Sequence, residues 1–224
     1  MMENKKIKVL LADDHPLMLL ALRTLFEAEP DIEIVGEAMD GEEAVRLASE
    51  LLPQVIIMDI AMPKLNGLDA TRQIKQLHSN IAVLVLTMHD DRDNILGIIE
   101  AGAAGYVTKT VFGKEVCSAI RAVVDGETVF SPEVTQRLLQ DVMRYSEKPQ
   151  IIDNIEKITK REREILKLAA NGLSNKEIAA RLDLALGTIK AYTAELFEKL
   201  NVGSRTEAVV KALRGGLLSI DDLD

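Results

Sequence analysis

Short apolar runs alternate with segments of helical periodicity through the first 126 residues of the chain. The runs are rich in Val, Ile and Leu, which is typical of strands buried on both faces of a parallel sheet. They predict strands at 7–12, 32–37, 55–59, 82–87 and 105–109, and helices at 16–28, 41–51, 69–78, 92–102 and 113–125. Five successive βα units favour a doubly wound α/β fold with a five-stranded parallel sheet.

The pattern from Ile155 onward is purely helical. Three capping boxes mark helix starts, at Thr159 and Glu162, Ser174 and Glu177, and Ser204 and Glu207. They predict a small all-α domain of four helices, the third at 188–200 and the fourth at 205–214, that contains a helix-turn-helix.

The chain therefore divides into two domains with a joint between them. Its 224 residues are enough for two cores. We expect one domain at 1–126, a linker with a helix at 127–154, which opens with a Ser-Pro helix-start signal and turns polar, and a second domain at 155–224.

Composition favours a soluble globular protein, with 47% hydrophobic and 28% charged residues and no apolar run near the length of a membrane span. The first residues pass directly into a strand-like run without a cleavage site, so we expect a cytoplasmic protein without membrane association. The single cysteine, Cys117, excludes an internal disulfide and a Cys-based zinc cluster, and its position on an apolar helix face predicts core packing.

Charge is distributed unevenly. Residues 1–154 carry 15 Lys and Arg against 25 Asp and Glu, whereas residues 155–217 carry 12 against 8. A basic second domain is compatible with a nucleic-acid partner and does not by itself establish one.

Polar residues stand at the ends of four predicted strands: Asp13 and Asp14, Asp59, Thr87, and Lys109. Parallel sheets place ligands at the carboxyl ends of their strands, and the loops after the first and third strands face each other at the switch point. We therefore expect the three aspartates to converge. Packed carboxylates resist joint ionisation unless a cation compensates, and Mg²⁺ is the hard oxygen-binding ion that suits them.

This set of residues fits phosphoryl transfer. The Asp59 carboxylate is the predicted nucleophile, Asp13 and Asp14 would hold the metal with it, and Lys109 and Thr87 would contact phosphoryl oxygens. A structural alternative remains open, because Asp14 or His15 could simply cap the helix that begins at Pro16, and aspartates at strand ends often accept hydrogen bonds from loop amides.

The set Asp13, Asp14, Asp59, Thr87, Tyr106 and Lys109, with MDIAMPKLNGLDA around Asp59, resembles the receiver domain of bacterial response regulators over residues 6–126. The resemblance implies a flavodoxin-like sheet and phosphorylation of Asp59 by a cognate sensor histidine kinase. It also implies Mg²⁺ bound by Asp13, Asp14, Asp59 and the backbone carbonyl of Ala61. Thr87 and Tyr106 would form the switch: the hydroxyl moves toward the new phosphoryl group and the ring changes rotamer.

Residues 155–217, with ITKREREILKLAANGLSNKEIAARL and GTIKAYTAELFEKLNVGSRTEAV, are similar to the LuxR-type helix-turn-helix of NarL/FixJ response regulators. The similarity implies binding to double-stranded promoter DNA, with 188–200 as the recognition helix in the major groove. The implied base-facing residues are Lys190, Ala191 and Ala194, and the implied phosphate-proximal residues are Ser174, Lys176, Thr188, Tyr192, Lys199 and Arg205.

Helical geometry places Ile189, Leu196 and Leu200 on the core face of the recognition helix. Glu195 and Glu198 share the opposite face with Ala191 and Ala194. Acidic groups there are unfavourable beside phosphates, so we expect weak nonspecific affinity and reliance on dimerisation, although Glu195 could accept a hydrogen bond from cytosine.

The two resemblances together imply a two-component response regulator, not an enzyme, in which phosphorylation releases or dimerises the DNA-binding domain to regulate transcription. A hydrolase that uses an aspartyl phosphate is one alternative, but it generally needs an acid two residues after the nucleophile, where this chain has Ala61. A receiver whose helical tail binds a protein instead of DNA is the other.

Overall fold

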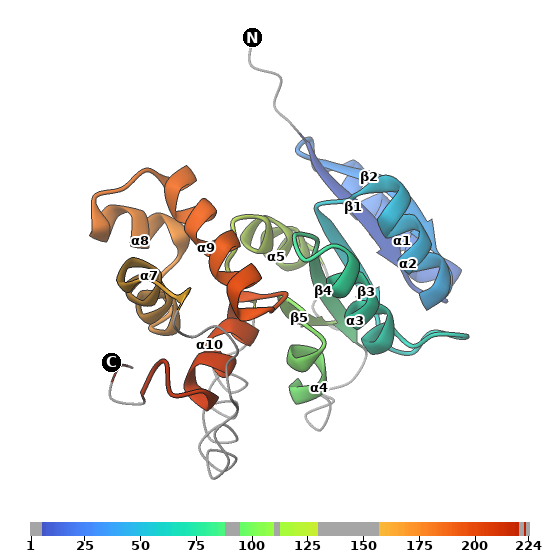
Figure 1. Ribbon diagram of the computed structural model, residues 1–224. Coiled ribbons are helices and arrows are strands. Elements are labelled where there is room, and N and C mark those ends of the chain that lie inside the picture. The colour runs from blue at the N-terminus through green and yellow to red at the C-terminus, as the bar shows by residue number, and fades with distance from the viewer. Residues whose placement is uncertain (1–5, 88–94, 110–112, 130–156, 220–221, 223–224) are drawn as a thin grey trace.

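The structure is a computed structural model that describes residues 6–87, 95–109, 113–129, 157–219 and 222. Its first half contains a parallel sheet in the order β2-β1-β3-β4-β5 (Figure 1). The strands are β1 (Ile7–Ala12), β2 (Ile32–Ala38), β3 (Val55–Asp59), β4 (Ala82–Thr87) and β5 (Gly105–Thr108). The predicted doubly wound α/β fold is confirmed, and each strand lies within one residue of its predicted bounds.

Helices cover both faces of the sheet, as right-handed crossovers require. Helices α1 (Pro16–Glu27) and α5 (Lys114–Val124) bury apolar side chains against one face, and Cys117 lies in that core at 1% exposure. Helices α2 (Gly41–Leu51), α3 (Gly67–Leu77) and α4 (Ile95–Glu100) pack against the other face. Because both faces are covered, the carboxyl edge of the strands remains for a site.

The second half is all helical, as predicted. It consists of α7 (Lys160–Ala170), α8 (Asn175–Leu182), α9 (Leu186–Leu200) and α10 (Arg205–Arg214). Two apolar clusters hold it together, one around Leu166, Leu196 and Leu200 and the other around Ile178 and Ile189. Among the described residues, no helix combines the length and apolarity that crossing a membrane requires.

Two of the three predicted capping boxes are complete: Thr159 with Glu162, and Ser174 with Glu177. At the third, Ser204 accepts from the N–H of Glu207. The Glu207 carboxylate, however, accepts from the N–H of Gly203 at 2.7 Å, one residue before the cap. The helix starts were therefore predicted correctly, and the reciprocal bond of the third was not.

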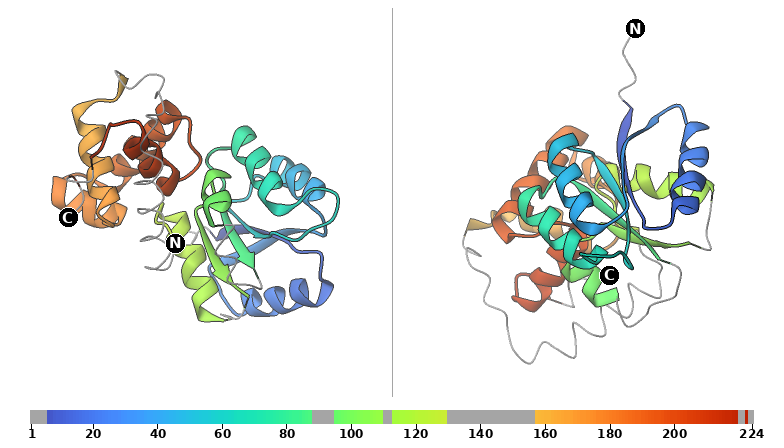
Figure 2. Two further views of the ribbon diagram at one scale, coloured as in Figure 1. Left: turned by 90° about the horizontal axis from the view of Figure 1, so that it is seen from below. Right: turned by 90° about the vertical axis from the view of Figure 1, so that its right-hand side faces the viewer.

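The four C-terminal helices lie beside α4, α5 and β5 and away from β2 (Figures 1 and 2). Residues 127–129 still accompany the sheet, because Tyr106 N donates to Val129 O at 3.0 Å and Val129 N donates to Ala104 O at 3.2 Å. Most of the predicted linker lies outside the described residues.

Candidate functional site

The carboxyl edge of the sheet brings the ends of three strands together. Lys109 follows β5, and its Nζ lies 2.6 Å from Asp13 Oδ2 after β1 and 2.9 Å from Asp59 Oδ1 at the end of β3. All three residues are buried. The predicted convergence is present in the structure, with the ammonium between two carboxylates.

Burial and charge oppose each other at this site. Desolvation is the main reason why the pKa of Asp59 is raised, and Asp13 adds to the effect while Lys109 opposes it. Desolvation works against the charge of Lys109 as well, yet its hydrogen bonds to Asp13 and Asp59 raise its pKa overall. The Lys109 ammonium neutralises part of the clustered negative charge, and a further cation would stabilise the ionised carboxylates more.

Asp14 and His15 complete the acidic rim. One ligand atom from each of Asp13, Asp14, His15 and Asp59 lies within 4.8 Å of the others. Asp14 Oδ1 is buried, and His15 Nδ1 lies 2.6 Å from it. Clustered carboxylate oxygens are the donor set that Mg²⁺ prefers, so the residues fit this metal.

The capping alternative is not what the structure contains. His15 is the N-cap residue of α1, but its side chain makes no capping hydrogen bond. Its N–H instead donates to Asp13 Oδ1 at 2.9 Å, so the strand-end aspartate does accept a hydrogen bond from a loop amide, as the other part of the alternative expected. The acidic side chains thus face one another at the strand ends and do not close the first turn of α1.

The loop after Asp59 continues the rim. Ile60 O accepts from Met62 N at 3.1 Å and from Gly67 N at 2.9 Å, which folds the loop back toward its own start. A Cβ at position 67 would overlap the carbonyl of Asp59, so a glycine is required there. Ala61, the residue whose carbonyl is the predicted fourth metal ligand, is exposed on this loop.

The two predicted switch residues lie on neighbouring strands. Thr87 is the last residue of β4, and its side chain falls outside the described part of the structure. Tyr106, on β5, pairs with Val85 and packs partly buried against the core under α2, α3 and α4.

Helix α9, which contains the predicted recognition helix, has the orientation expected from its periodicity. Ile189, Leu196 and Leu200 are at most 2% exposed, as predicted. The predicted contact residues Lys176, Thr188, Lys190, Ala191 and Ala194 are exposed, and Tyr192 is half-buried. Ser174 caps α8 and accepts from Glu177 N.

Two predicted phosphate-proximal cations make contacts inside the domain. Lys199 Nζ lies 2.6 Å from a carboxylate oxygen of buried Glu162. Arg205 is 8% exposed, and its Nη2 donates to the carbonyl oxygens of Ala169 and Leu173 at the end of α7. Desolvation lowers the pKa of Arg205 to about 10. Both side chains stabilise the helical domain in this arrangement.

Sequence patterns did not indicate the contacts between the two domains. Lys190 Nζ lies 2.9 Å from Asp125 Oδ1, and Asn175 Nδ2 donates to the Asp125 carbonyl at 2.7 Å. Arg214 on α10 lies 3.5 Å from Glu100 on α4. A cavity of about 430 Å³ beside these contacts is lined by residues of both domains. Gly126 lies at this contact, and its missing side chain leaves room for Asn175.

Residues 9–121 match the family described as response regulator receiver domain, and residues 156–212 match the bacterial regulatory proteins of the luxR family. The transcriptional regulatory protein LiaR of Bacillus subtilis (strain 168) is 42% identical over 213 residues, which are 95% of this chain and 100% of LiaR. The transcriptional regulatory protein DegU of Brevibacillus brevis is 33% identical over 229 residues, with 97% of each chain covered. A solved structure of a LuxR-family two-component response regulator from Aurantimonas sp. SI85-9A1 aligns with a TM-score of 0.57 and 36% identity, over 62% of this chain and 99% of that one.

Proposed function

Because the chain belongs to the LuxR-type response regulators, which join a receiver domain to a LuxR-family DNA-binding domain, we propose that phosphorylation of Asp59 controls its binding to promoter DNA. The protein is a transcriptional regulator in this family. The observation that carries the proposal is the buried cluster of Asp13, Asp59 and Lys109 at the ends of three parallel strands.

The proposed reaction takes a phosphoryl group from a phosphohistidine of a cognate sensor kinase. One Asp59 oxygen forms the new O–P bond while the N–P bond breaks, and the electron pair stays on the histidine. Lys109 offers positive charge to the incoming phosphoryl oxygens, and Thr87 would offer its hydroxyl.

Asp13, Asp14, Asp59 and the Ala61 carbonyl would hold Mg²⁺ at this site. The metal supplies the charge neutralisation that lets an anionic carboxylate approach an anionic phosphoryl group. The convergence of ligand atoms from Asp13, Asp14 and Asp59 within 4.8 Å of one another supports this assignment. Tyr106 and Thr87 are the proposed switch residues, through which the new negative charge would bias two arrangements of the domain.

The DNA-binding half uses the exposed face of α9. Lys190, Ala191 and Ala194 are the proposed base-facing residues, flanked near phosphates by Ser174, Lys176, Thr188 and Tyr192. Lys199 and Arg205 would approach phosphates only after leaving their contacts inside the helical domain. In the arrangement described here Lys190 contacts Asp125 of the receiver, which supports a form in which the domains must separate before DNA binds. A phosphorylated homodimer would then occupy paired half-sites, in the cytoplasm.

The proposal is tested with purified full-length protein, Mg²⁺ and acetyl phosphate. Wild-type protein should acquire an acid-stable, base-labile adduct at Asp59 and shift promoter fragments more strongly when phosphorylated. Asp59→Asn should do neither, and Asp69→Asn, a partly exposed acid on α3, should behave as wild type. Label retained by Asp59→Asn would show that another residue is the acceptor.

The same experiment separates the alternatives. Sustained turnover of phosphoester substrates would favour a hydrolase, and Ala61 at the position of the required acid argues against that outcome. A phosphorylated protein that never binds specific DNA would instead favour a protein-binding tail.

A further inference from the structure

The loop from Ile60 to Asn66, between β3 and α3, packs closely against neighbouring backbone near its C-terminal end. At its C-terminal end Gly67 lies directly behind the carbonyl of Asp59, and a side chain there would overlap that oxygen. On its other side the carbonyl of Leu65 lies against Gly41, where a Cβ would again overlap. The loop that follows Asp59 is therefore packed between the end of β3 and Gly41, the first residue of α2.

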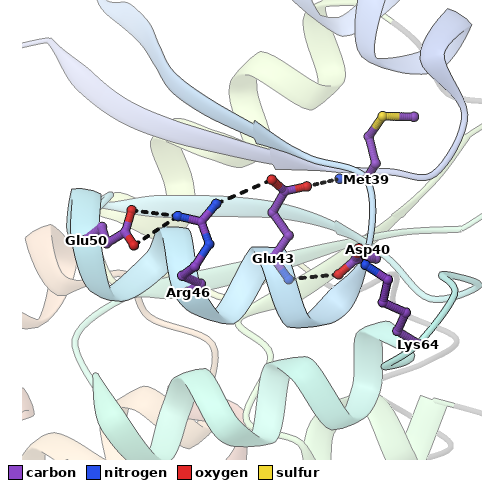
Figure 3. Close-up of polar contacts among 6 residues, drawn as sticks. All are labelled: Met39, Asp40, Glu43, Arg46, Glu50 and Lys64. Atoms are coloured by element: carbon purple, nitrogen blue, oxygen red, sulfur yellow. Dashed lines mark hydrogen bonds and ion pairs between the residues drawn. The ribbon is translucent and has the colours of Figure 1, made fainter.

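An ion pair closes the contact with α2. Lys64 Nζ lies 2.6 Å from Asp40 Oδ2, between residues 24 positions apart in sequence. The second oxygen, Asp40 Oδ1, accepts from Glu43 N at 2.8 Å and caps α2 (Figure 3). One carboxylate thus joins the start of α2 to the loop after Asp59. The Asp40 side chain is 11% exposed, so neighbouring atoms restrict its position. The Lys64 side chain is 61% exposed and reaches Asp40 from the surface.

The backbone conformation of Lys64 indicates that this ion pair has a structural role. Its φ of 61° lies in the left-handed region, which lysine rarely adopts. The residue follows Pro63, whose carbonyl accepts from Leu65 N at 2.8 Å and fixes the turn. An unfavourable conformation persists only where surrounding contacts hold it, and the ion pair with Asp40 is such a contact.

We propose that Asp40 and Lys64 are positioning residues that clamp the β3–α3 loop, and with it the Ala61 carbonyl, in the arrangement that receives Mg²⁺ beside Asp59. Neither side chain touches Asp59, so the pair acts through the loop. This inference rests on the proposed function and deepens it, because it assigns the metal affinity of the site partly to residues outside the acidic rim.

The charges of the pair are stable at neutral pH. The hydrogen bond from Lys64, assisted by the N–H of Glu43, lowers the pKa of Asp40, and the bond to Asp40 raises the pKa of Lys64. Both groups are therefore ionised at the near-neutral pH at which the receiver would be phosphorylated.

A neighbouring ion pair provides a matched control. Arg46 bonds Glu50 at 2.9 Å and Glu43 at 3.4 Å, and all three residues lie on α2 (Figure 3). This network strengthens the helix without reaching the loop. Arg46→Met should therefore leave the loop unchanged if the clamp is specific.

The variants separate charge, cap and backbone strain. Asp40→Asn keeps an oxygen for the Glu43 N–H and removes the charge. Lys64→Met removes the ammonium and keeps the strained backbone, whereas Lys64→Asn removes the ammonium and suits the left-handed conformation. Lys64→Arg keeps the charge and should rescue.

Two readouts test the clamp. Amide hydrogen exchange of residues 60–66 in Mg²⁺-free protein should accelerate in Asp40→Asn and Lys64→Met. In phosphorylation by acetyl phosphate, the midpoint Mg²⁺ concentration should rise about two- to fivefold at an unchanged maximal rate. The double variant should change neither readout more than a single variant does, because both substitutions remove the same ion pair. Lys64→Asn and Lys64→Met both lose that ion pair, but amide exchange should be slower in Lys64→Asn than in Lys64→Met.

Wild-type exchange and a wild-type Mg²⁺ midpoint in both charge variants would overturn the clamp, as would an equal effect in Arg46→Met. A wild-type protein that is never phosphorylated at Asp59 would instead overturn the proposed function. The exchange experiment would still decide the clamp in that case, because it needs neither metal nor phosphate.

Discussion

The ammonium of Lys190, on the proposed recognition helix α9, lies 2.9 Å from the carboxylate of Asp125, at the end of the receiver helix α5. A side chain held by the receiver does not at the same time face a base in the major groove. Asn175 and the Asp125 carbonyl form a second contact beside it at 2.7 Å. The Asp125 residue thus binds the helical domain through both its side chain and its backbone.

Asp125→Asn should increase the affinity of the unphosphorylated protein for promoter DNA. It removes the ion pair to Lys190 and leaves the backbone contact with Asn175. Both side chains are substantially exposed, so we expect an effect of less than about 1 kcal/mol, or up to about fivefold. Fluorescence anisotropy with labelled promoter DNA measures it, with Asp69→Asn as control. An affinity equal to wild type would mean that this pair does not restrain α9.

Gly203→Ala should weaken the docking of the two domains. A Cβ at this position would overlap the Lys75 side chain, whose Nζ is fixed by bonds to the carbonyls of Ser79 and Ile81 at 2.6 and 2.7 Å. We expect a loss of about 1–3 kcal/mol in docking, as for other overpacked contacts. The radius of gyration in solution scattering should increase. Gly187→Ala, where the added Cβ meets no atom within 4 Å, should leave it unchanged.

Lys109→Met should destabilise the receiver domain most strongly without Mg²⁺. The substitution leaves Asp13 and Asp59 buried together without their shared cation. Removing one partner of a buried ion pair usually lowers the free energy of unfolding by about 3 kcal/mol. Added Mg²⁺ should restore stability more in the variant than in wild type, as followed by thermal unfolding. Lys114→Met, an exposed lysine on α5, is the control. Equal Mg²⁺ responses in both proteins would contradict a metal site at these acids.

Glu162→Gln should reduce the acid sensitivity of the helical domain. Despite opposing desolvation, the bonds from Lys199 and Thr159 lower the pKa of Glu162 from its usual 4.5. A depressed folded-state pKa contributes stability above pH 4.5 that is lost as the pH falls through the folded value.

Glutamine keeps an oxygen for the Thr159 cap and loses the pair with Lys199. The variant should therefore be about 1–2 kcal/mol less stable at pH 7 and should lose less below pH 4.5. Amide exchange in α7 across this range measures the difference, and parallel pH profiles for variant and wild type would count against it.

The local sequence pattern was sufficient to predict those features in which a physical rule links residues close together in the chain. The five strands were predictable because short Val- and Ile-rich runs bury both faces of a sheet, and their parallel order placed Asp13, Asp59 and Lys109 at one edge. The buried face of α9 followed from the 3.6-residue period, which fixes Ile189, Leu196 and Leu200 on one side. These features depend on covalent geometry and burial, which the amino-acid order specifies directly.

Only the tertiary structure decided the contacts between charged side chains that lie far apart in sequence. Lys64 with Asp40, Lys190 with Asp125 and Lys199 with Glu162 have no periodic signature, since any exposed lysine can pair with many carboxylates. Their partners depend on how loops pass one another and how the two domains dock. The sequence by itself determined which residues form the acidic rim and which face of α9 is buried, whereas packing in three dimensions decided which lysines in the described part of the chain are paired with a carboxylate and which remain unpaired at the surface.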